Sequence, residues 1–315
     1  MKISNQQTRS FNFQRSNVKE DEVMIVCDFK ENIKLGGGPN EMNQDFYHRQ
    51  QCTVFGCAVI FFDPVLKKTK TVYVDYFSDV LSHDGVFVRD CISDLVSKIY
   101  KICPRLKELK KLNIWSDVGL HFRCQEVAHF LLVDLPKFFK INVEWNTFAE
   151  CHGKSIVDGH FGLLSRWIND IETKQKISSI DSLIHLLNQK LINSNFKIKD
   201  VNEELFIHFF EYTQNSRPKM YKKLYIPNIT HYYHFESEFN LNSGLVCLKI
   251  KMLTDSHRYQ ENVCSKIKVI EQKETRQTKF GSSSTETSKH KRINPEEIQY
   301  GANTSRRLQV QSQYF

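Results

Sequence analysis

Residues 23–29 read Val23-Met24-Ile25-Val26-Cys27-Asp28-Phe29, an apolar run in which one aspartate appears near the end. A segment that is apolar at successive positions predicts a strand buried on both faces of a sheet. A carboxylate at the end of such a strand would leave the core and point toward solvent or a ligand. The position of Asp28 is therefore the starting point for predicting both the fold and the chemistry.

The same arrangement occurs twice more along the chain. The short apolar segment Leu112-Asn113-Ile114-Trp115-Ser116 is followed at once by Asp117. Asp158 comes after the strand-like residues 141–148 and a turn at 151–154, and it opens a helical stretch. Carboxylates at strand ends come together only if the strands are neighbours in one sheet. Three such carboxylates repel one another unless divalent cations lie among them, so this layout predicts a two-metal phosphoryl-transfer site.

The pattern around these aspartates predicts an α/β domain. Three hairpin-linked strands followed by two crossover units is the element order of the ribonuclease-H-like fold, a mixed five-stranded sheet flanked by helices. In that fold the catalytic acids lie on the first strand, the fourth strand and the last helix, where the three aspartates fall. The predicted strands are 23–29, 52–62, 69–77, 112–116 and 141–148, and the predicted helices are 84–103, 121–139 and 158–172.

The chain divides into four predicted parts. Residues 1–22 form a polar leader and residues 23–176 form the ribonuclease-H-like core. Residues 177–264 are predicted to form a helix followed by a small β-rich appendage, with aromatic-rich strand candidates at 204–212, 222–236 and 245–252. Residues 265–315 are rich in Lys, Gln, Ser and Thr, and this basic tail is expected to be disordered.

Composition limits the class of protein. The 315 residues are 40% hydrophobic, which is enough for a packed core, and the net charge of +8 is a mild indication of a nucleic-acid partner. Nine cysteines are scattered without a CxxC pair, so a zinc ribbon is not predicted. The N-terminus lacks the apolar segment of a signal peptide, and no apolar run is long enough to span a membrane. We therefore expect a soluble intracellular protein.

Five blocks of the sequence resemble, in order, the transposase domain of eukaryotic cut-and-paste DNA transposons. The resemblance covers about residues 23–172 and departs from the family pattern where Ser155 and His160 stand in place of usual glycines. The blocks are Asp28-Phe29-Lys30-Glu31-Asn32, Ser116-Asp117, His121-Phe122-Arg123, Glu144-Trp145-Asn146, and His152-Gly153-Lys154 leading to Asp158-Gly159.

The resemblance implies a DDE/D-type transposase that cleaves and transfers DNA strands in the nucleus. It implies Asp28, Asp117 and Asp158 as catalytic metal ligands for two Mg²⁺ or Mn²⁺ ions. We expect Lys154 to contact a phosphate and His152 to orient a carboxylate or contact the leaving group. The expected partners are DNA, as transposon ends and target, together with a homo-oligomer, and no membrane.

Several alternatives remain open from the sequence. Glu150, Glu144 or Glu172 could supply the third carboxylate instead of Asp158, and His121, one helical turn past Asp117, could face the site. The alternative function is a catalytically inactive or domesticated transposase remnant that binds DNA or protein. A stand-alone nuclease of the same fold is a third reading. The exonuclease form of it is disfavoured because the position two residues after Asp28 is Lys30 rather than an acid.

Overall fold

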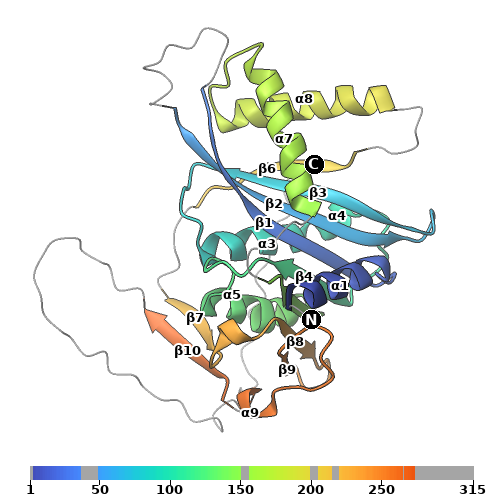
Figure 1. Ribbon diagram of the computed structural model, residues 1–315, viewed down its shortest axis with the longest axis vertical. Coiled ribbons are helices and arrows are strands. Elements are labelled where there is room, and N and C mark those ends of the chain that lie inside the picture. The colour runs from blue at the N-terminus through green and yellow to red at the C-terminus, as the bar shows by residue number, and fades with distance from the viewer. Residues whose placement is uncertain are drawn as a thin grey trace, which may run out of the picture. The chain divides into compact units, whose positions relative to one another are not determined.

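The apolar run that ends near Asp28 forms an inner strand of a large mixed sheet in the computed structural model of the chain (Figure 1). The structure describes residues 3–36, 49–149, 156–198, 205–214, 220–264 and 266–273. Within these residues the sheet has eight strands in the order β6-β3-β2-β1-β4-β5-β8-β9. The strands are β1 (Glu22–Lys34), β2 (Gln51–Asp63), β3 (Lys68–Ser78), β4 (Lys111–Ser116), β5 (Asn142–Thr147), β6 (Ile207–Glu211), β8 (His234–Phe239) and β9 (Val246–Lys251).

The pairing directions combine hairpins with crossovers. Strands β1, β2 and β3 pair antiparallel, whereas β1, β4 and β5 pair parallel. Strand β6 joins β3 in parallel at one edge, and β8 and β9 add antiparallel strands beyond β5 at the other. The strand of Asp28 thus lies between the hairpin strand β2 and the parallel strand β4, so the strands that precede Asp28 and Asp117 are neighbours in one sheet.

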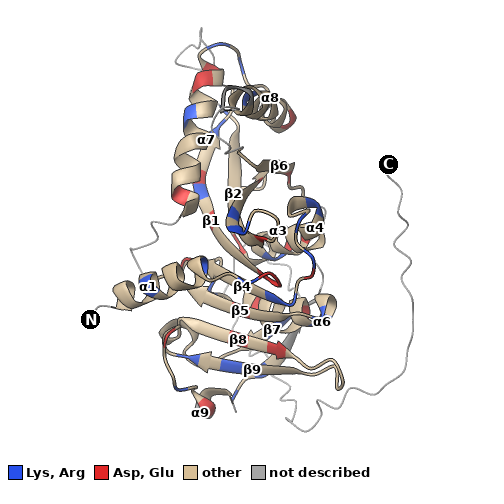
Figure 2. Cartoon of the chain, turned by 90° about the vertical axis from the view of Figure 1, so that its right-hand side faces the viewer, with Lys and Arg blue, Asp and Glu red and all other residues tan. Residues whose placement is uncertain are grey.

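Helices cover both faces of the sheet. Figure 2 shows α1 and α7 on one side of the strands and α3, α4 and α6 on the other. Asp84 caps α3 because its carboxylate accepts hydrogen bonds from the backbone N–H groups of Val86 and Phe87. The helices are α1 (Ile3–Ser16), α3 (Gly85–Ser97), α4 (Ile99–Ile102), α5 (Gln125–His129), the π-helical turn η1 (Phe130–Asp134), α6 (Leu135–Phe139), α7 (Ile156–Glu172), α8 (Ile180–Ile198), the 3-10 turn η3 (Ile229–His231) and α9 (Glu261–Cys264).

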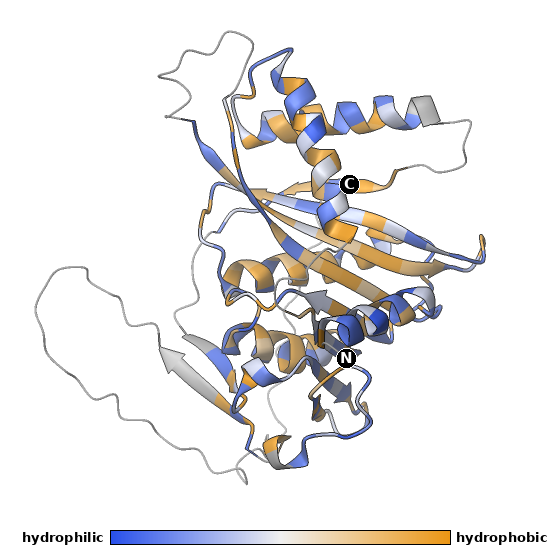
Figure 3. Ribbon diagram, in the orientation of Figure 1, coloured by the Kyte–Doolittle hydropathy of each residue, from blue (hydrophilic) through white to orange (hydrophobic). Residues whose placement is uncertain are grey.

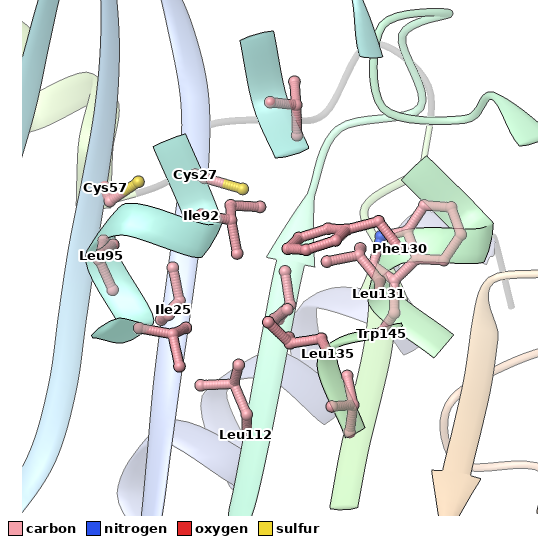
Figure 4. Close-up of a cluster of buried hydrophobic side chains, with 14 of the residues drawn as sticks. Ile25, Cys27, Cys57, Ile92, Leu95, Leu112, Phe130, Leu131, Leu135 and Trp145 are labelled. Carbon is pink, nitrogen blue, oxygen red and sulfur yellow. The ribbon is translucent and has the colours of Figure 1, made fainter. Parts of the chain in front are cut away.

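Alternation along the strands divides the core into two clusters. Ile25 and Cys27 face α3, α5 and α6, and Figure 4 shows them with Ile92, Leu95 and other apolar side chains of this cluster. Met24 and Val26 face the opposite way and pack in the cluster that includes residues of α1, α7 and α8. Figure 3 shows the apolar colour concentrated on the central strands, as expected for strands that are buried on both faces.

The structure corrects three expectations about the parts outside the core. The sheet contains eight strands rather than five, because β6, β8 and β9 join it instead of forming a separate small β appendage. The remaining described strands, β7 (Met220–Tyr225) and β10 (Lys268–Lys273), pair as a two-stranded sheet. The predicted single strand at 222–236 is in fact β7, η3 and the start of β8.

The ends of the chain also differ from the prediction. The expected polar leader contains α1, in which Gln7 and Phe11 are buried. Phe11 packs edge-on against Trp115 and Phe148, with ring centroids 5.3 and 5.2 Å away. Residues Met1–Glu274 group into one compact unit, and β10 lies inside the predicted tail. The rest of the tail, from residue 274 onward, lies outside the described residues.

None of the helices in the described residues is both long enough and apolar enough to cross a membrane.

Candidate functional site

The register between β1 and β4 brings two of the predicted acids together. Along this parallel pair Met24 lies opposite Asn113 and Val26 lies opposite Trp115. Continuing the same register by two positions places Asp28 opposite Asp117. Adjacent strands are about 4.8 Å apart, and paired residues point to the same face of a sheet. This extrapolation sets the two residues side by side, with Asp117 just past the end of β4 and Asp28 in the middle of β1, which continues to Lys34 rather than ending at Phe29 as expected.

Asp158 belongs to helix α7, which packs on the face of the sheet toward which Asp28 points. Val26 and Trp115, which share the orientation of Asp28 and Asp117, pack in the cluster that contains Val157 of α7. Helix α7 contacts both β1 and β2, and Asp158 lies in its exposed first turn. Asp28 and Asp117 thus come from neighbouring strands, and Asp158 comes from the helix that packs on the same face of the sheet.

The pKa of Asp28 responds to burial and to the other two acids. Burial raises the pKa of the half-buried Asp28, and the negative charges of Asp117 and, more weakly, Asp158 raise it further. The backbone N–H of Phe29 donates to Asp28 Oδ1 at 2.8 Å and acts in the opposite direction. The resulting pKa of Asp28 is about 7. At neutral pH this carboxyl is therefore about half protonated, which is the expected response to burial together with nearby like charges.

Asp117 is followed by a tight turn that carries a histidine back over it. The backbone N–H of Gly119 donates to Asp117 Oδ1 at 2.9 Å, and His121 Nε2 lies 3.6 Å from the same oxygen. A Cβ on Gly119 would lie 2.5 Å from His121 Cε1, so only glycine leaves room for this ring. The His121 Nε2 atom is buried and has no hydrogen-bond partner among the described residues. Burial lowers the pKa of His121, so the imidazole is neutral and its nitrogen can act as a ligand or acceptor.

An aromatic wall adjoins the acids on the opposite face of β1. Phe29 stacks on His83 with ring centroids 4.4 Å apart and meets His121 edge-on at 5.0 Å. His83 Nε2 lies 3.0 Å from Asn32 Oδ1, which also accepts a hydrogen bond from Thr53. The sequence predicted a possible site role for His121 but none for His83, because His83 lies in a loop before α3 where no sequence pattern indicated a site.

The row of Asp28 continues across the sheet to a fourth carboxylate. Asp28 pairs with Gly56 of β2, and Gly56 pairs with Asp75 of β3. A Cβ on Gly56 would lie 2.4 Å from Phe161 Cε1, so α7 rests on the sheet at this glycine. The prediction did not include Asp75, although an acid within the alternating run Val72-Tyr73-Val74-Asp75-Tyr76 on a buried strand was a usable signal.

Asp75 explains the unusual residue in the first turns of α7. His160 lies in the first turns of α7, and its Nε2 lies 2.7 Å from Asp75 Oδ2. Both side chains are almost fully buried, and His160 stacks on Tyr73 with ring centroids 4.2 Å apart. Asp75 Oδ1 and His160 Nδ1 have no hydrogen-bond partner among the described residues. This pair attaches α7 to β3 two residues beyond Asp158.

The alternative third acids can now be placed. Glu144 lies four residues before the position on β5 that matches Asp117, about 13 Å along the strand. It is bound by Lys111 at 2.7 Å and by Gln14 at 2.7 Å, within the sheet interior. Glu172 lies at the other end of α7, about 21 Å from Asp158. Neither reaches the cluster, so Asp158 is the acid that the described residues bring there.

Three predicted residues cannot be placed in the same way. His152, Lys154 and Glu150 fall in the segment 150–155, which lies outside the described residues. A Cβ on Gly159 would meet no atom within 4 Å, so the surface beside Asp158 is open. In the part of the chain that is described, no three His, Cys, Asp or Glu side chains are close enough to form a ready-made metal site.

Comparison with known proteins assigns a family. A protein-family profile described as a domain of unknown function (DUF8701) matches residues 7–243, and the chain belongs to this family. The matched region begins within α1 and ends just after β8, so it includes elements on both sides of the predicted core. No curated protein and no solved structure matches the chain.

Proposed function

We propose that this chain is a DDE/D-type, transposase-like enzyme that cleaves and transfers DNA strands with two Mg²⁺ or Mn²⁺ ions. The observation that carries the proposal is the parallel register of β1 and β4, which sets Asp28 beside Asp117 under the helix that carries Asp158. Asp28 and Asp117 come from neighbouring parallel strands and Asp158 from the helix that packs over them, near the carboxyl end of β4, and α/β enzymes place their sites at such strand ends. The proposed partner is therefore DNA and the proposed location is the nucleus.

The topology supports the ribonuclease-H-like part of this proposal. The five strands nearest the site run in the order β3-β2-β1-β4-β5, with two antiparallel pairings followed by two parallel ones. That is the arrangement expected of a ribonuclease-H-like core. Strands β6, β8 and β9 are then additions at the two edges of the same sheet.

The residues present suit divalent cations in their chemistry. Mg²⁺ and Mn²⁺ prefer hard carboxylate oxygens. The pKa of Asp28 is raised first by burial and then by the negative charge of Asp117 and Asp158, and a bound cation would compensate that charge. Asp28 interacts with both other acids and would be shared, while Asp117 and Asp158 would each hold one ion. When bound, the ions would supply an activated water and stabilise the leaving oxygen.

The chain's own side chains would position the substrate. The neutral His121 nitrogen beside Asp117 would hold that carboxylate in place or add a ligand. The open surface at Gly159 leaves room for a phosphate at the positive end of α7. His152 and Lys154 remain proposed phosphate and carboxylate contacts from the neighbouring segment.

A second candidate is a domesticated remnant that binds DNA or protein without cleaving it. It is favoured by the lack of a ready-made three-ligand group among the described residues. The local hydrogen bonds of the acids also favour it. The backbone N–H groups of Phe29 and Gly119 donate to Asp28 and Asp117, and these bonds hold the carboxylates against their own chain.

Metal-dependent nicking of a supercoiled plasmid separates the two candidates. We expect nicking in Mg²⁺ or Mn²⁺ by the wild type, and its loss in Asp28→Asn, Asp117→Asn and Asp158→Asn. Asp170→Asn is the matched control, because Asp170 lies on α7 but pairs with Lys190 on the surface. A wild type that binds DNA but never cleaves it, and whose melting ignores metal, would replace the enzyme by the remnant.

A further inference from the structure

A hollow lies away from the acids. It has a volume of about 340 Å³ and lies where the end of the β2–β3 hairpin meets α4 and the start of β6. Lys70, one of its lining residues, is five positions from Asp75 on β3, about 17 Å along the strand from the acidic row. The apolar lining residues Phe61 and Val72 belong to the cluster on the α3 face, opposite Asp28. We call this hollow the basic pocket.

Positive charge dominates its lining. Lys70, Lys101 and Arg105 line the basic pocket, and Asp63 is the one acid among its lining residues. Figure 2 shows basic residues along α4 and the loop that leaves it. The lining therefore carries a surplus of positive charge, because three cations are offset by one carboxylate.

Asp63 forms ion pairs with Arg105 and Lys70 but not with Lys101. Its carboxylate has no exposed surface and accepts hydrogen bonds from the backbone of Val65 and Leu66. Arg105 Nη1 lies 2.8 Å from it and Lys70 Nζ lies 3.5 Å from it. Lys101 is exposed and forms no ion pair with any described residue. The basic pocket is thus lined by two cations that pair with Asp63 and by a third, Lys101, that is exposed and has no ion pair among the described residues.

The remaining lining residues are apolar, apart from the imidazole of His208, and two of them carry aromatic rings. Phe206 is 39% exposed, and the Lys70 ammonium lies 4.9 Å from its ring centroid. Burial, and then the charge of Lys101, lower the pKa of His208, so this imidazole adds a neutral polar ring. A cavity of this size lies at the small end of ligand sites and accommodates one small molecule or one monomer of a chain. Cations beside aromatic rings match a ligand with both a phosphate and a planar ring.

We propose that the basic pocket binds one nucleotide, with its phosphate between Lys101 and Arg105 and its base against Phe206 and His208. Guanidinium and ammonium groups are the usual protein partners of phosphate, and bases stack readily on aromatic side chains. The nucleotide could be free or part of a single DNA or RNA strand, since both present the same chemistry. The proposal does not depend on catalysis by the acids.

Further lysines favour a nucleic-acid strand as the source. Lys67 and Lys68 are exposed at the turn of the β2–β3 hairpin, and Lys107 is exposed beyond Arg105. Phosphates that precede and follow the bound nucleotide would pass these side chains. A strand should therefore bind more tightly and with greater salt dependence than a free mononucleotide.

Binding measurements on the full chain test the proposal. The probes are dAMP, deoxyadenosine, a fluorescein-labelled single-stranded DNA decamer and a poly-glutamate peptide, all in EDTA so that no metal is bound at the acidic site. We expect dAMP to bind and deoxyadenosine to bind at least about tenfold more weakly, since it lacks the phosphate. Lys101→Gln should weaken binding of dAMP or of the decamer, whichever the wild type binds more tightly, by about tenfold. It should also lower the slope of log K against log salt for that probe by about one.

A matched variant controls for general charge effects. Lys140→Gln removes one exposed lysine that also has no ion pair among the described residues. Lys140 lies at the end of α6 just before β5, and β1 and β4 separate β5 from the strands that line the basic pocket. Its binding should equal that of the wild type. Thermal melting of Lys101→Gln should also match the wild type, because Lys101 contributes no ion pair.

Each outcome decides the question. Decamer binding that depends on Lys101, without dAMP binding, identifies a strand as the source and supports the proposal. Equal binding by wild type, Lys101→Gln and Lys140→Gln overturns it, as does binding of a poly-glutamate peptide that depends on Lys101 in place of either nucleotide probe. Asp28→Asn should bind like the wild type, so failure of the basic pocket and failure of the acidic site are distinguishable.

Discussion

Replacement of Asp28 by asparagine tests the acidic cluster directly. The amide keeps an oxygen that can accept the hydrogen bond from the Phe29 N–H, which is 2.8 Å long in the native chain. It removes the charge that burial, Asp117 and Asp158 disfavour. The substitution should therefore stabilise the metal-free protein, and the gain should depend on pH.

The magnitude follows from the pKa of Asp28. A folded-state value of about 7 against the ordinary 3.8 corresponds to about 4 kcal/mol, an upper value for a half-buried group. The folded protein binds this proton more tightly than the unfolded chain, so its stability falls as pH rises from about 4 to about 7 and then stays level. Relative to wild type, Asp28→Asn should gain little at pH 4, and about 2.5 kcal/mol of the gain should develop between pH 5 and pH 8.

Urea unfolding of both proteins in EDTA, at several pH values between 5 and 8, measures this difference. Asp170→Asn serves as the control, because its surface carboxylate has a lowered pKa and remains ionised over this range. Millimolar Mn²⁺ should then raise the midpoint of the wild type and have much less effect on Asp28→Asn. A stability difference that is the same at pH 5 and pH 8 would refute the crowding of carboxylates at Asp28.

Three further substitutions test the packing around the site by urea unfolding. Gly119→Ala should lower the free energy of unfolding by about 1–3 kcal/mol, because its Cβ would lie 2.5 Å from a His121 ring atom. Adding His121→Ala to the same chain should restore part of this loss, and an unchanged urea midpoint in Gly119→Ala would contradict the tight turn. Phe11→Ala should cost about 3–5 kcal/mol because α1 is packed on the sheet, whereas a loss below about 1 kcal/mol would mean that α1 contributes little. Gly56→Ala should cost about 1–3 kcal/mol through Phe161, and the second substitution Phe161→Leu should recover part of the loss; if it does not, α7 does not rest on Gly56.

Local patterns in the sequence were sufficient for the inner part of the fold. The apolar run before Asp28 and the segment before Asp117 predicted buried strands, and both form inner strands paired in parallel. The spacing of apolar residues after Asp158 predicted a helix, which is α7. These features could be predicted because burial on one or both faces imposes a short repeat on neighbouring residues.

The neighbours of each element could not be predicted in this way. The aromatic segments of β6 and β8 were expected as strands or parts of strands, yet the sequence did not show that they add to opposite edges of the main sheet. A strand edge accepts any partner that supplies backbone hydrogen bonds, so the choice depends on packing far away in the chain. The polar composition of residues 1–22 likewise concealed α1, because only a few of its side chains are buried.

The acids show the same division between local pattern and tertiary structure. The sequence by itself predicted that Asp28 and Asp117 follow buried apolar segments and that Asp158 stands near the start of a helix, although β1 continues past Asp28 to Lys34. Only the tertiary structure showed that Asp75 shares their row and binds His160, and that Glu144 is held elsewhere by Lys111. The physical reason is that hydrogen bonding and charge compensation act between side chains across strands, whereas the sequence pattern records only which face each residue occupies.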